Sequence, residues 1–385
     1  MMEFDFATAG RIIFQNGAIN EIGKIAVKFG TVAFLVSGSG KQNRQKVEEL
    51  FALEGIKVIH FSVSGEPSVD HVIAAIKVLK QADCDLVVGI GGGSVIDTAK
   101  AVAALATNPG DLLDYLEVVG KGKPLVNKPL PFIAIPTTSG TGSEVTRNAV
   151  LSVPERQVKV SLRSKDMLAD VAIIDPMLTV STPPDVTAAT GMDALCQVLE
   201  PMVSSRANVL VDAYCRAGLE RAGWALLRCY RNPDDMEART AMSFVSLMGG
   251  LALANAGLGA VHGFAGPLGG MYAAPHGALC ARLLPAVVRV NLAALKQRDI
   301  NHSAVGRYDL CTRLLLQNDR VDASILPGWL DDLCTAMQIP RLGSFGLQRQ
   351  DFAAIIPKAR MASSMKGNPI VLSDEELEQI LSDSL

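Results

Sequence analysis

The clearest indication of the architecture comes from DLVVGIGGGSVIDTAK, residues 85–100. Its first half is an apolar run typical of a strand buried on both faces, and its second half has helical spacing. Between the two lies Gly91-Gly92-Gly93-Ser94, where the backbone can approach a ligand and a helix N-terminus offers free N–H groups. The stretch therefore predicts a strand, a pyrophosphate-binding turn and a helix. The alternative is a glycine-rich turn that binds nothing.

The same alternation extends to both sides of this stretch. Short β-branched runs predict further strands at 32–36, 58–63, 132–135 and 171–174, and helical patterns lie between several of them, at 41–53, 69–81 and 95–105. Beyond TVSTPPD, residues 179–185, only helical patterns follow, for example at 207–229 and 236–256. We therefore expect an α/β domain with a Rossmann-like parallel sheet over 1–182 and an all-α domain over 183–385.

A second cluster of glycines and hydroxyls follows the strand predicted at 132–135. The segment PTTSGTGSE, residues 136–144, carries Thr137, Thr138 and Thr141. Because open parallel sheets bind ligands at the carboxyl ends of their strands, this cluster predicts a second part of the same ligand site. The alternative is a polar loop in which Thr141 or Ser143 caps a helix. A weaker signal, Gly38-Ser39-Gly40, follows the strand at 32–36.

Composition excludes several classes of protein. The chain has 385 residues, of which 49 % are hydrophobic and 19 % charged, so we expect a folded protein with a sizeable core. A net charge of −3 argues against a nucleic-acid partner. Seven scattered cysteines without a CxxC pair argue against a disulfide framework, and MMEFDFATAG does not read as a signal peptide. We therefore expect a reduced, cytoplasmic setting.

One uncharged segment is long enough to cross a bilayer. It runs over residues 240–261 and contains Asn255 and four glycines. It has no matching second span and no basic flank. We therefore expect a buried core helix rather than a membrane span.

Two of the five histidines stand near glycines in AVHGFAGPLGGMYAAPHG, residues 260–277. We expect His262 to end the long apolar helix, Gly266-Pro267 to break it, and His276 to lie near the start of the next helix. Upstream, Asp193 and Gln197 are four residues apart and share a helix face. A carboxylate in an apolar stretch needs a partner or a metal, although Asp193 as a plain helix cap is the alternative.

Together these segments resemble the iron-containing, group III alcohol dehydrogenase family over nearly the whole chain. The motifs that carry the resemblance are GGGSVIDTAK, PTTSGTGSE, GMDALCQ, the histidine segment and SSMKGNP at 363–369. The resemblance implies a dehydroquinate synthase-like architecture. We further expect a cytoplasmic homo-oligomer, a dimer, that acts on a small alcohol or aldehyde and has no nucleic-acid or membrane partner.

The resemblance also implies cofactors and site residues. It implies NAD or NADP bound by Gly92, Gly93, Ser94, Asp97, Thr137, Thr138, Thr141, Asn148 and Lys159, with Gly38 beside the adenosine ribose. It implies a divalent metal, iron or zinc, held by Asp193, His262 and His276.

Three positions depart from the family pattern. Gln197 stands where a metal-binding histidine is usual and is a weaker ligand, Gly266 stands where a proton-relay histidine is usual, and Gly38 replaces an acidic residue.

The implied reaction is metal-assisted hydride transfer between a nicotinamide and a small alcohol or its aldehyde or ketone. Two alternatives stay open: a metal-independent oxo-acid reductase similar to the maleylacetate reductases, and a nucleotide-binding protein whose catalytic site has decayed.

Overall fold

The computed structural model describes residues 4–156 and 158–385, and these residues form two compact units. The sheet unit comprises Ala7–Thr138 and Gly142–Val180. The helical unit comprises residues 4–6, Ser139–Thr141 and Ser181–Leu385. These units are defined by contacts within the folded chain. Whether residues 1–182 and 183–385 are two domains that fold independently stays a prediction.

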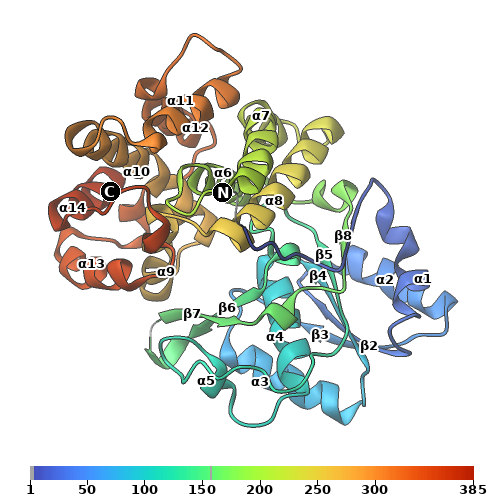
Figure 1. The fold of residues 1–385 in the computed structure, drawn as a ribbon. Helices are drawn as coiled ribbons and strands as arrows, with labels where there is room; N and C mark the ends of the chain where they lie inside the picture. The colour runs from blue at the N-terminus through green and yellow to red at the C-terminus, as the bar shows by residue number, and fades with distance from the viewer. Residues whose placement is uncertain (1–3, 157) are drawn as a thin grey trace. The chain divides into compact units, whose positions relative to one another are not determined.

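The sheet unit is built on parallel strands, as the sequence predicts (Figure 1). In spatial order the described strands of this sheet are β1 (Arg11–Phe14), β8 (Val171–Ile174), β5 (Phe132–Pro136), β4 (Leu86–Gly91), β2 (Val32–Ser37) and β3 (Lys57–Ser62). Five of them fall where the apolar runs place them, and β1 is an addition at the edge. A separate antiparallel pair, β6 (Asn148–Val153) and β7 (Val158–Arg163), was not expected from the sequence.

Helices cover both faces of the sheet. The described helices of this unit are α1 (Ile22–Ala26), α2 (Lys41–Leu53), α3 (Val69–Gln81), α4 (Gly93–Ala106) and α5 (Leu112–Tyr115). Successive residues of β4 point to opposite faces, so Val88 and Ile90 join the core beneath α1 and α2. Gly89 faces α4, where an added Cβ would lie only 2.9 Å from the Cβ of Ala99. That close approach fixes α4 tightly against the strand.

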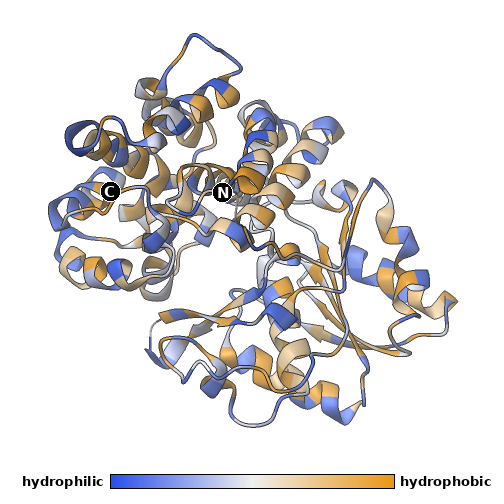
Figure 2. Cartoon of the chain, in the orientation of Figure 1, coloured by the Kyte–Doolittle hydropathy of each residue, from blue (hydrophilic) through white to orange (hydrophobic). Residues whose placement is uncertain are grey.

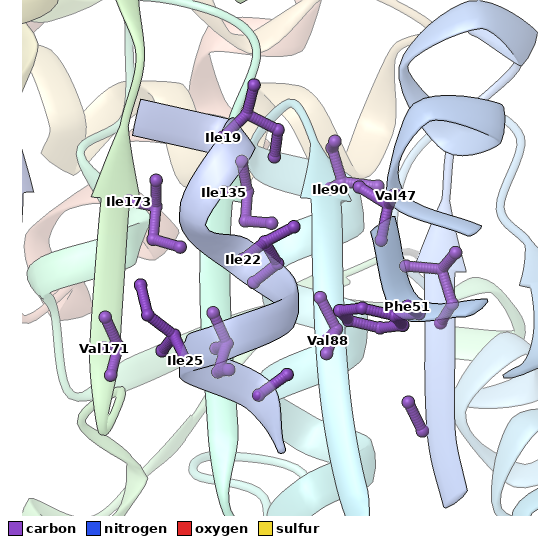
Figure 3. Packing of buried hydrophobic residues seen from close by; sticks show 14 of the residues in the cluster. Ile19, Ile22, Ile25, Val47, Phe51, Val88, Ile90, Ile135, Val171 and Ile173 are labelled. Atoms are coloured by element: carbon purple, nitrogen blue, oxygen red, sulfur yellow. The ribbon is translucent and has the colours of Figure 1, made fainter. Parts of the chain in front are cut away.

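The buried residues of the core beneath α1 and α2 are aliphatic except for the ring of Phe51. Figure 3 shows Ile19, Ile22 and Ile25 lying over the strands, with Val47 and Phe51 of α2 beside them. Figure 2 shows the hydrophobic residues that run along the strands of this sheet. Burial of this apolar surface is the main favourable term in the folding of the unit.

The helical unit consists of long helices, and α6 packs against α7, α8 and α10. Its described α-helices are α6 (Pro184–Val203), α7 (Val209–Arg231), α8 (Met236–Ala256), α9 (Ala260–Met271), α10 (His276–Arg298), α11 (Ser303–Leu316), α12 (Leu326–Ala336), α13 (Phe352–Met361) and α14 (Asp374–Ser384).

The long uncharged segment is not one helix. It is broken between α8 and α9, where Gly257 has a φ of +70° that favours glycine, and the two helices are bent by 97°. In the described part of the chain, α10 is the one single helix long and apolar enough to cross a membrane, and 89 % of its apolar window is buried inside the unit. That burial is typical of a core helix.

The packing of Phe51 generates a stability prediction. Phe51→Ala removes a fully buried ring and is expected to lower the free energy of unfolding by about 3–5 kcal/mol. Leu53→Ala on the same helix is the control, because Leu53 is 80 % exposed and its loss is expected to cost under about 0.5 kcal/mol. Urea denaturation followed by circular dichroism measures both variants. Equal effects would show that Phe51 does not pack as described.

Candidate functional site

The two glycine- and hydroxyl-rich motifs of the sheet unit lie side by side. β4 and β5 are neighbours in the sheet and pair Gly91 with Pro136 at their carboxyl ends. The N–H of Thr137 donates to the carbonyl of Gly91 at 2.9 Å. An added Cβ on Gly92 would lie 3.4 Å from the side chain of Thr138. The structure therefore brings Gly92, Thr137 and Thr138 together, as the motifs predict.

Helix α4 starts at once beyond this turn. Gly92 is its N-cap residue and Gly93 its first residue, with Ser94 in the first turn. The first N–H groups of a helix carry partial positive charge and have no partner within the helix. This end of the sheet is therefore suited to an anionic group such as a pyrophosphate.

Gly38 lies beside the same helix end. The chain runs from β2 out to β3 and then returns to β4 on the other side of β2, so the strand order reverses between β2 and β4. Open α/β sheets bind ligands at such a reversal. An added Cβ on Gly38 would lie 3.6 Å from a methyl group of Val95, in the first turn of α4. Gly38 thus lies at this reversal, and its contact with a ribose stays a prediction.

A buried lysine fixes the loop that leads to β6. Lys100 is 1 % exposed, and its Nζ lies 2.7 Å from the carbonyl oxygen of Ser143 and 2.8 Å from that of Asn148. It also lies 3.0 Å from the Ser143 hydroxyl and 3.1 Å from the Thr146 hydroxyl. Burial lowers the pKa of Lys100 to about 8. The ammonium therefore serves as an internal clamp and not as a surface charge.

Asp97 takes part in the same network. One oxygen accepts a hydrogen bond from the Ser143 hydroxyl at 2.5 Å, and the other accepts from the N–H of Val150 at 2.9 Å. The sequence motif predicts Asp97 on the cofactor side, whereas here both oxygens are used to hold the loop. Its effect on a ligand would then be exerted through the loop.

The remaining predicted cofactor residues are spread more widely. Asn148 opens β6, and Lys159 on β7 forms an ion pair with Glu66 at 3.3 Å. Thr141 belongs, with Ser139 and Gly140, to the helical unit. In that unit the N–H of Gly140 donates to the Ser246 hydroxyl at 2.9 Å. A cofactor role for Thr141, Asn148 and Lys159 stays a prediction.

In the helical unit, three predicted metal ligands converge with one that was not predicted. Asp193 comes from α6, His262 from α9, and His276 and Cys280 from α10. One donor atom from each lies within 4.8 Å of the others. His262 Nε2 is 3.1 Å from Asp193 Oδ1, and His276 Nε2 is 3.9 Å from the same oxygen. Together they present a carboxylate, two imidazoles and a thiol to one point.

The cluster attracts positive charge. Burial raises the pKa of the Asp193 carboxyl, but its hydrogen bond with His262 and the charge of His276 lower it overall. Burial alone would lower the pKa of both histidines, yet Cys280 and Asp193 raise it above the usual value. A carboxylate, two imidazoles and a thiol whose donor atoms lie within 4.8 Å of one another are ligand types that a divalent cation binds. The residues present therefore fit a metal ion.

A second carboxylate orients His262. Glu200 is 4 % exposed, and its Oε2 lies 2.6 Å from His262 Nδ1. Its Oε1 accepts a hydrogen bond from the N–H of Val261 at 2.8 Å. A carboxylate on the far ring nitrogen fixes the tautomer in which Nε2 faces the cluster. Nothing in the local sequence pattern marked Glu200, which lies one helix turn beyond Gln197.

Some sequence expectations about this region are wrong. His262 does not end the long apolar helix but lies in the first turn of α9, because the break falls at Gly257 instead of Gly266-Pro267. Pro267 lies inside α9. The alternative of Asp193 as a helix cap is also wrong, because Asp193 is in the middle of α6. His276 is the first residue of α10, as expected.

Gln197 was expected as a weaker ligand, which stays a prediction, whereas Cys280 was not expected in the cluster. Gln197 is buried, and its Nε2 donates to the carbonyl of Gly140 at 3.0 Å, so its amide nitrogen holds the 139–141 segment. Cys280 follows His276 by four residues on one helix, so the two share a face. That spacing was the available signal for Cys280.

Both parts of the chain match models of the same protein family. Residues 9–176 match the family model described as iron-containing alcohol dehydrogenase, and residues 187–385 match the model of the C-terminal part of Fe-containing alcohol dehydrogenases. Alcohol dehydrogenase 4 of Saccharomyces cerevisiae (strain YJM789) is 34 % identical over 338 residues, which cover 87 % of this chain and 85 % of that protein.

Solved structures agree with the family models. A crystal structure of a 1,3-propanediol oxidoreductase has a TM-score of 0.91 and 31 % identity, with 100 % of both chains covered. Sulfoacetaldehyde reductase from Bifidobacterium kashiwanohense, solved in complex with NAD+, has a TM-score of 0.88 and 28 % identity over 100 % of this chain and 99 % of that chain.

The Lys100 clamp generates a prediction for the sheet unit. Lys100→Met leaves the buried carbonyls of Ser143 and Asn148 without this donor, at about 1–3 kcal/mol each. We expect lower stability in urea and at least a tenfold weaker affinity for NADH, measured by nicotinamide fluorescence. The control is Lys77→Met, because Lys77 is an exposed residue of α3. Unchanged NADH affinity in a folded Lys100→Met protein would contradict the role of this loop.

Proposed function

The chain belongs to the iron-containing alcohol dehydrogenase family, and on that premise we propose that Asp193, His262 and His276 hold its divalent metal. The observation that carries the proposal is the convergence of these three donors, from three helices, within 4.8 Å of one another. Two of the three are nearly buried, the side chains of Asp193 and His262 being 3 % and 9 % exposed. Because an isolated buried carboxylate is costly, a carboxylate that meets two imidazoles in the interior is typical of a metal site.

Family membership confirms the reaction class predicted from the sequence. The protein is an oxidoreductase that interconverts an alcohol and its carbonyl compound with a nicotinamide cofactor and a divalent metal. When bound, the metal supplies positive charge that stabilises an alkoxide, and the nicotinamide accepts or donates the hydride. We propose that the substrate is a small alcohol or aldehyde.

The residues of the helical unit have separate tasks in this proposal. Asp193 contributes negative charge at the centre of the cluster, and the two imidazoles contribute neutral nitrogen donors. Glu200 keeps the His262 ring in the orientation that presents Nε2. The His276 side chain is 33 % exposed, so the accessible side of the cluster is the one at His276.

The residues of the sheet unit bind the dinucleotide in this proposal. Gly92, Gly93 and Ser94 place the N-terminus of α4 against the pyrophosphate, and Thr137 and Thr138 add hydroxyls from the adjoining strand end. Asp97 and Lys100 act on this site by holding the loop at Ser143.

We further propose that NADP(H) is accepted as well as NAD(H). Gly38 carries no carboxylate that would repel a 2′-phosphate, and Lys41 is exposed at the start of the next helix. Arg44 is less available, because it lies 3.5 Å from Glu48 of the same helix.

We also propose a soluble, cytoplasmic homodimer whose partners are small molecules. The support is the family assignment together with the seven cysteines, all free and buried in the structure. Sedimentation equilibrium of the purified protein measures its oligomeric state.

The proposed metal site generates an activity prediction. Purified protein supplied with zinc or iron is expected to oxidise NADH when given short aldehydes, followed by loss of nicotinamide absorbance. Asp193→Asn is expected to lower kcat at least about 100-fold, as losing charge stabilisation in an active site commonly does. NADH affinity should change little, because the dinucleotide contacts proposed above are made by residues of the sheet unit.

Two outcomes would contradict this proposal. Turnover of an oxo-acid by metal-free protein at the full rate would favour the metal-independent reductase. Failure with every aldehyde and oxo-acid, despite measurable NADH binding, would favour a decayed site.

Gly38 generates a prediction about cofactor choice. Gly38→Asp is sterically tolerated, because its Cβ meets only a methyl of Val95 at 3.6 Å and the residue does not need a positive φ. The added carboxylate is expected to lower kcat/KM for NADPH relative to NADH by at least about tenfold, since it repels the 2′-phosphate. Gly40→Asp is the control, because an added Cβ there meets nothing within 4 Å. An unchanged ratio in Gly38→Asp would show that Gly38 does not face the ribose.

A further inference from the structure

We propose that Cys280 supplies a thiolate as the fourth protein ligand of the metal centre, and that this donor set favours zinc over iron. The inference rests on the proposed site of Asp193, His262 and His276 and extends it by one ligand. Cys280 would take the place of the histidine ligand that Gln197 replaces, and its sulfur would change which metal the site prefers.

The distances at Cys280 are those of a tetrahedral site. Its Sγ lies 3.6 Å from His276 Nε2 and 3.7 Å from His262 Nε2. With Zn–N of about 2.0–2.1 Å and Zn–S of about 2.3 Å, tetrahedral angles separate a sulfur and a nitrogen ligand by about 3.6 Å. The thiol therefore already lies where a shared cation would hold it.

Burial alone does not single out Cys280, because cysteine is often buried as a small apolar residue. Its partners do. The thiols of Cys196 and Cys334 point to backbone carbonyls, at 3.8 Å from Cys280 O and 3.2 Å from Ala281 O. Cys280 instead faces two imidazole nitrogens that also face a buried carboxylate.

Cys280 on α10 can replace the ligand that is missing on α6. On α6, the residue four after Asp193 is Gln197, whose amide nitrogen is bound to the Gly140 carbonyl. On α10, the residue four after His276 is Cys280, whose side chain lies in the cluster. The thiol on α10 thus replaces the imidazole missing from α6. The cluster then has four strong donors, as it would with a histidine at position 197.

Charge also favours this assignment. The two anions in direct reach of a metal are the Asp193 carboxylate and the Cys280 thiolate, whereas the Glu200 carboxylate acts only through the His262 ring. Affinity for divalent cations generally rises from Fe²⁺ to Zn²⁺, and a tetrahedral site with nitrogen and sulfur ligands is typical of zinc. A metal held by these residues would be reached from the side of His276, whose side chain is 33 % exposed.

Cobalt(II) substitution tests for the thiolate ligand, because a cobalt–thiolate bond absorbs in the near ultraviolet. Protein stripped with a chelator and reloaded with Co²⁺ is expected to show a near-ultraviolet band from thiolate-to-cobalt charge transfer. Cys280→Ser is expected to lose this band while its circular dichroism stays that of the parent, and Cys280→Ala serves if the serine variant does not fold. Cys334→Ser is the matched control, because Cys334 is also fully buried but its thiol is directed at a backbone carbonyl.

Metal competition tests the second part of the proposal. When stripped protein is offered equal Zn²⁺ and Fe²⁺ without oxygen, the parent should take up zinc, measured as bound metal. Cys280→Ser should lower the zinc-over-iron ratio at least about tenfold, since even a partner one shell beyond the ligands commonly changes affinity 10–100-fold. An unchanged ratio would overturn the claim about selectivity.

The outcomes separate this inference from the proposed function. Cobalt bound in the parent without a charge-transfer band, but lost in Asp193→Asn, would overturn the role of Cys280 and leave the three-ligand site standing. Cobalt bound equally by the parent and Asp193→Asn would overturn the proposed site itself, and the inference with it. A parent that binds no cobalt would also overturn both.

Discussion

The buried carboxylate of Glu200 is the contact on which the metal cluster depends. Helix α9 begins after a glycine break and has no side-chain cap of its own at Gly259. Glu200 supplies an acceptor to the N–H of Val261 while its other oxygen meets His262 Nδ1. A Cβ on Gly259 would approach Glu200 Oε1 to 2.8 Å, so the break and the carboxylate fit each other. Glu200, with Asn368 on the N–H of Ala260, thus fixes where α9 starts, and Glu200 also fixes which nitrogen His262 presents.

The sheet unit solves a similar problem in a similar way. In its ligand-side loop, as at the start of α9, a buried charged side chain binds polar groups of the backbone. Lys100 binds the carbonyls of Ser143 and Asn148, and Asp97 binds Ser143 from the side of α4. Buried groups of this kind are costly unless fully hydrogen-bonded, which is why both networks engage almost every available donor and acceptor. Each places polar backbone where a ligand needs it.

The sequence predicted those features that follow from local pattern. The strands at Leu86 and Phe132 and helix α2 were found from periodicity alone, because apolar spacing directly reports burial. The break at Gly257 was missed, since an uncharged run gives no periodic contrast and a φ of +70° leaves no mark beyond one glycine among several. Glu200 was missed because its role arises from helices that meet only in three dimensions. Cys280 was missed although it lies four residues after His276 and therefore shares its helix face.

In the proposed site a single metal ion binds to four side chains of the helical unit: Asp193, His262, His276 and Cys280. X-ray absorption at the zinc edge of the zinc-loaded protein is the decisive measurement, because it reports the atoms bound to the metal. The expected spectrum has one sulfur at about 2.3 Å together with nitrogen and oxygen ligands at about 2.0–2.2 Å. A spectrum with nitrogen and oxygen neighbours only, unchanged by Cys280→Ser, would contradict the four-ligand site.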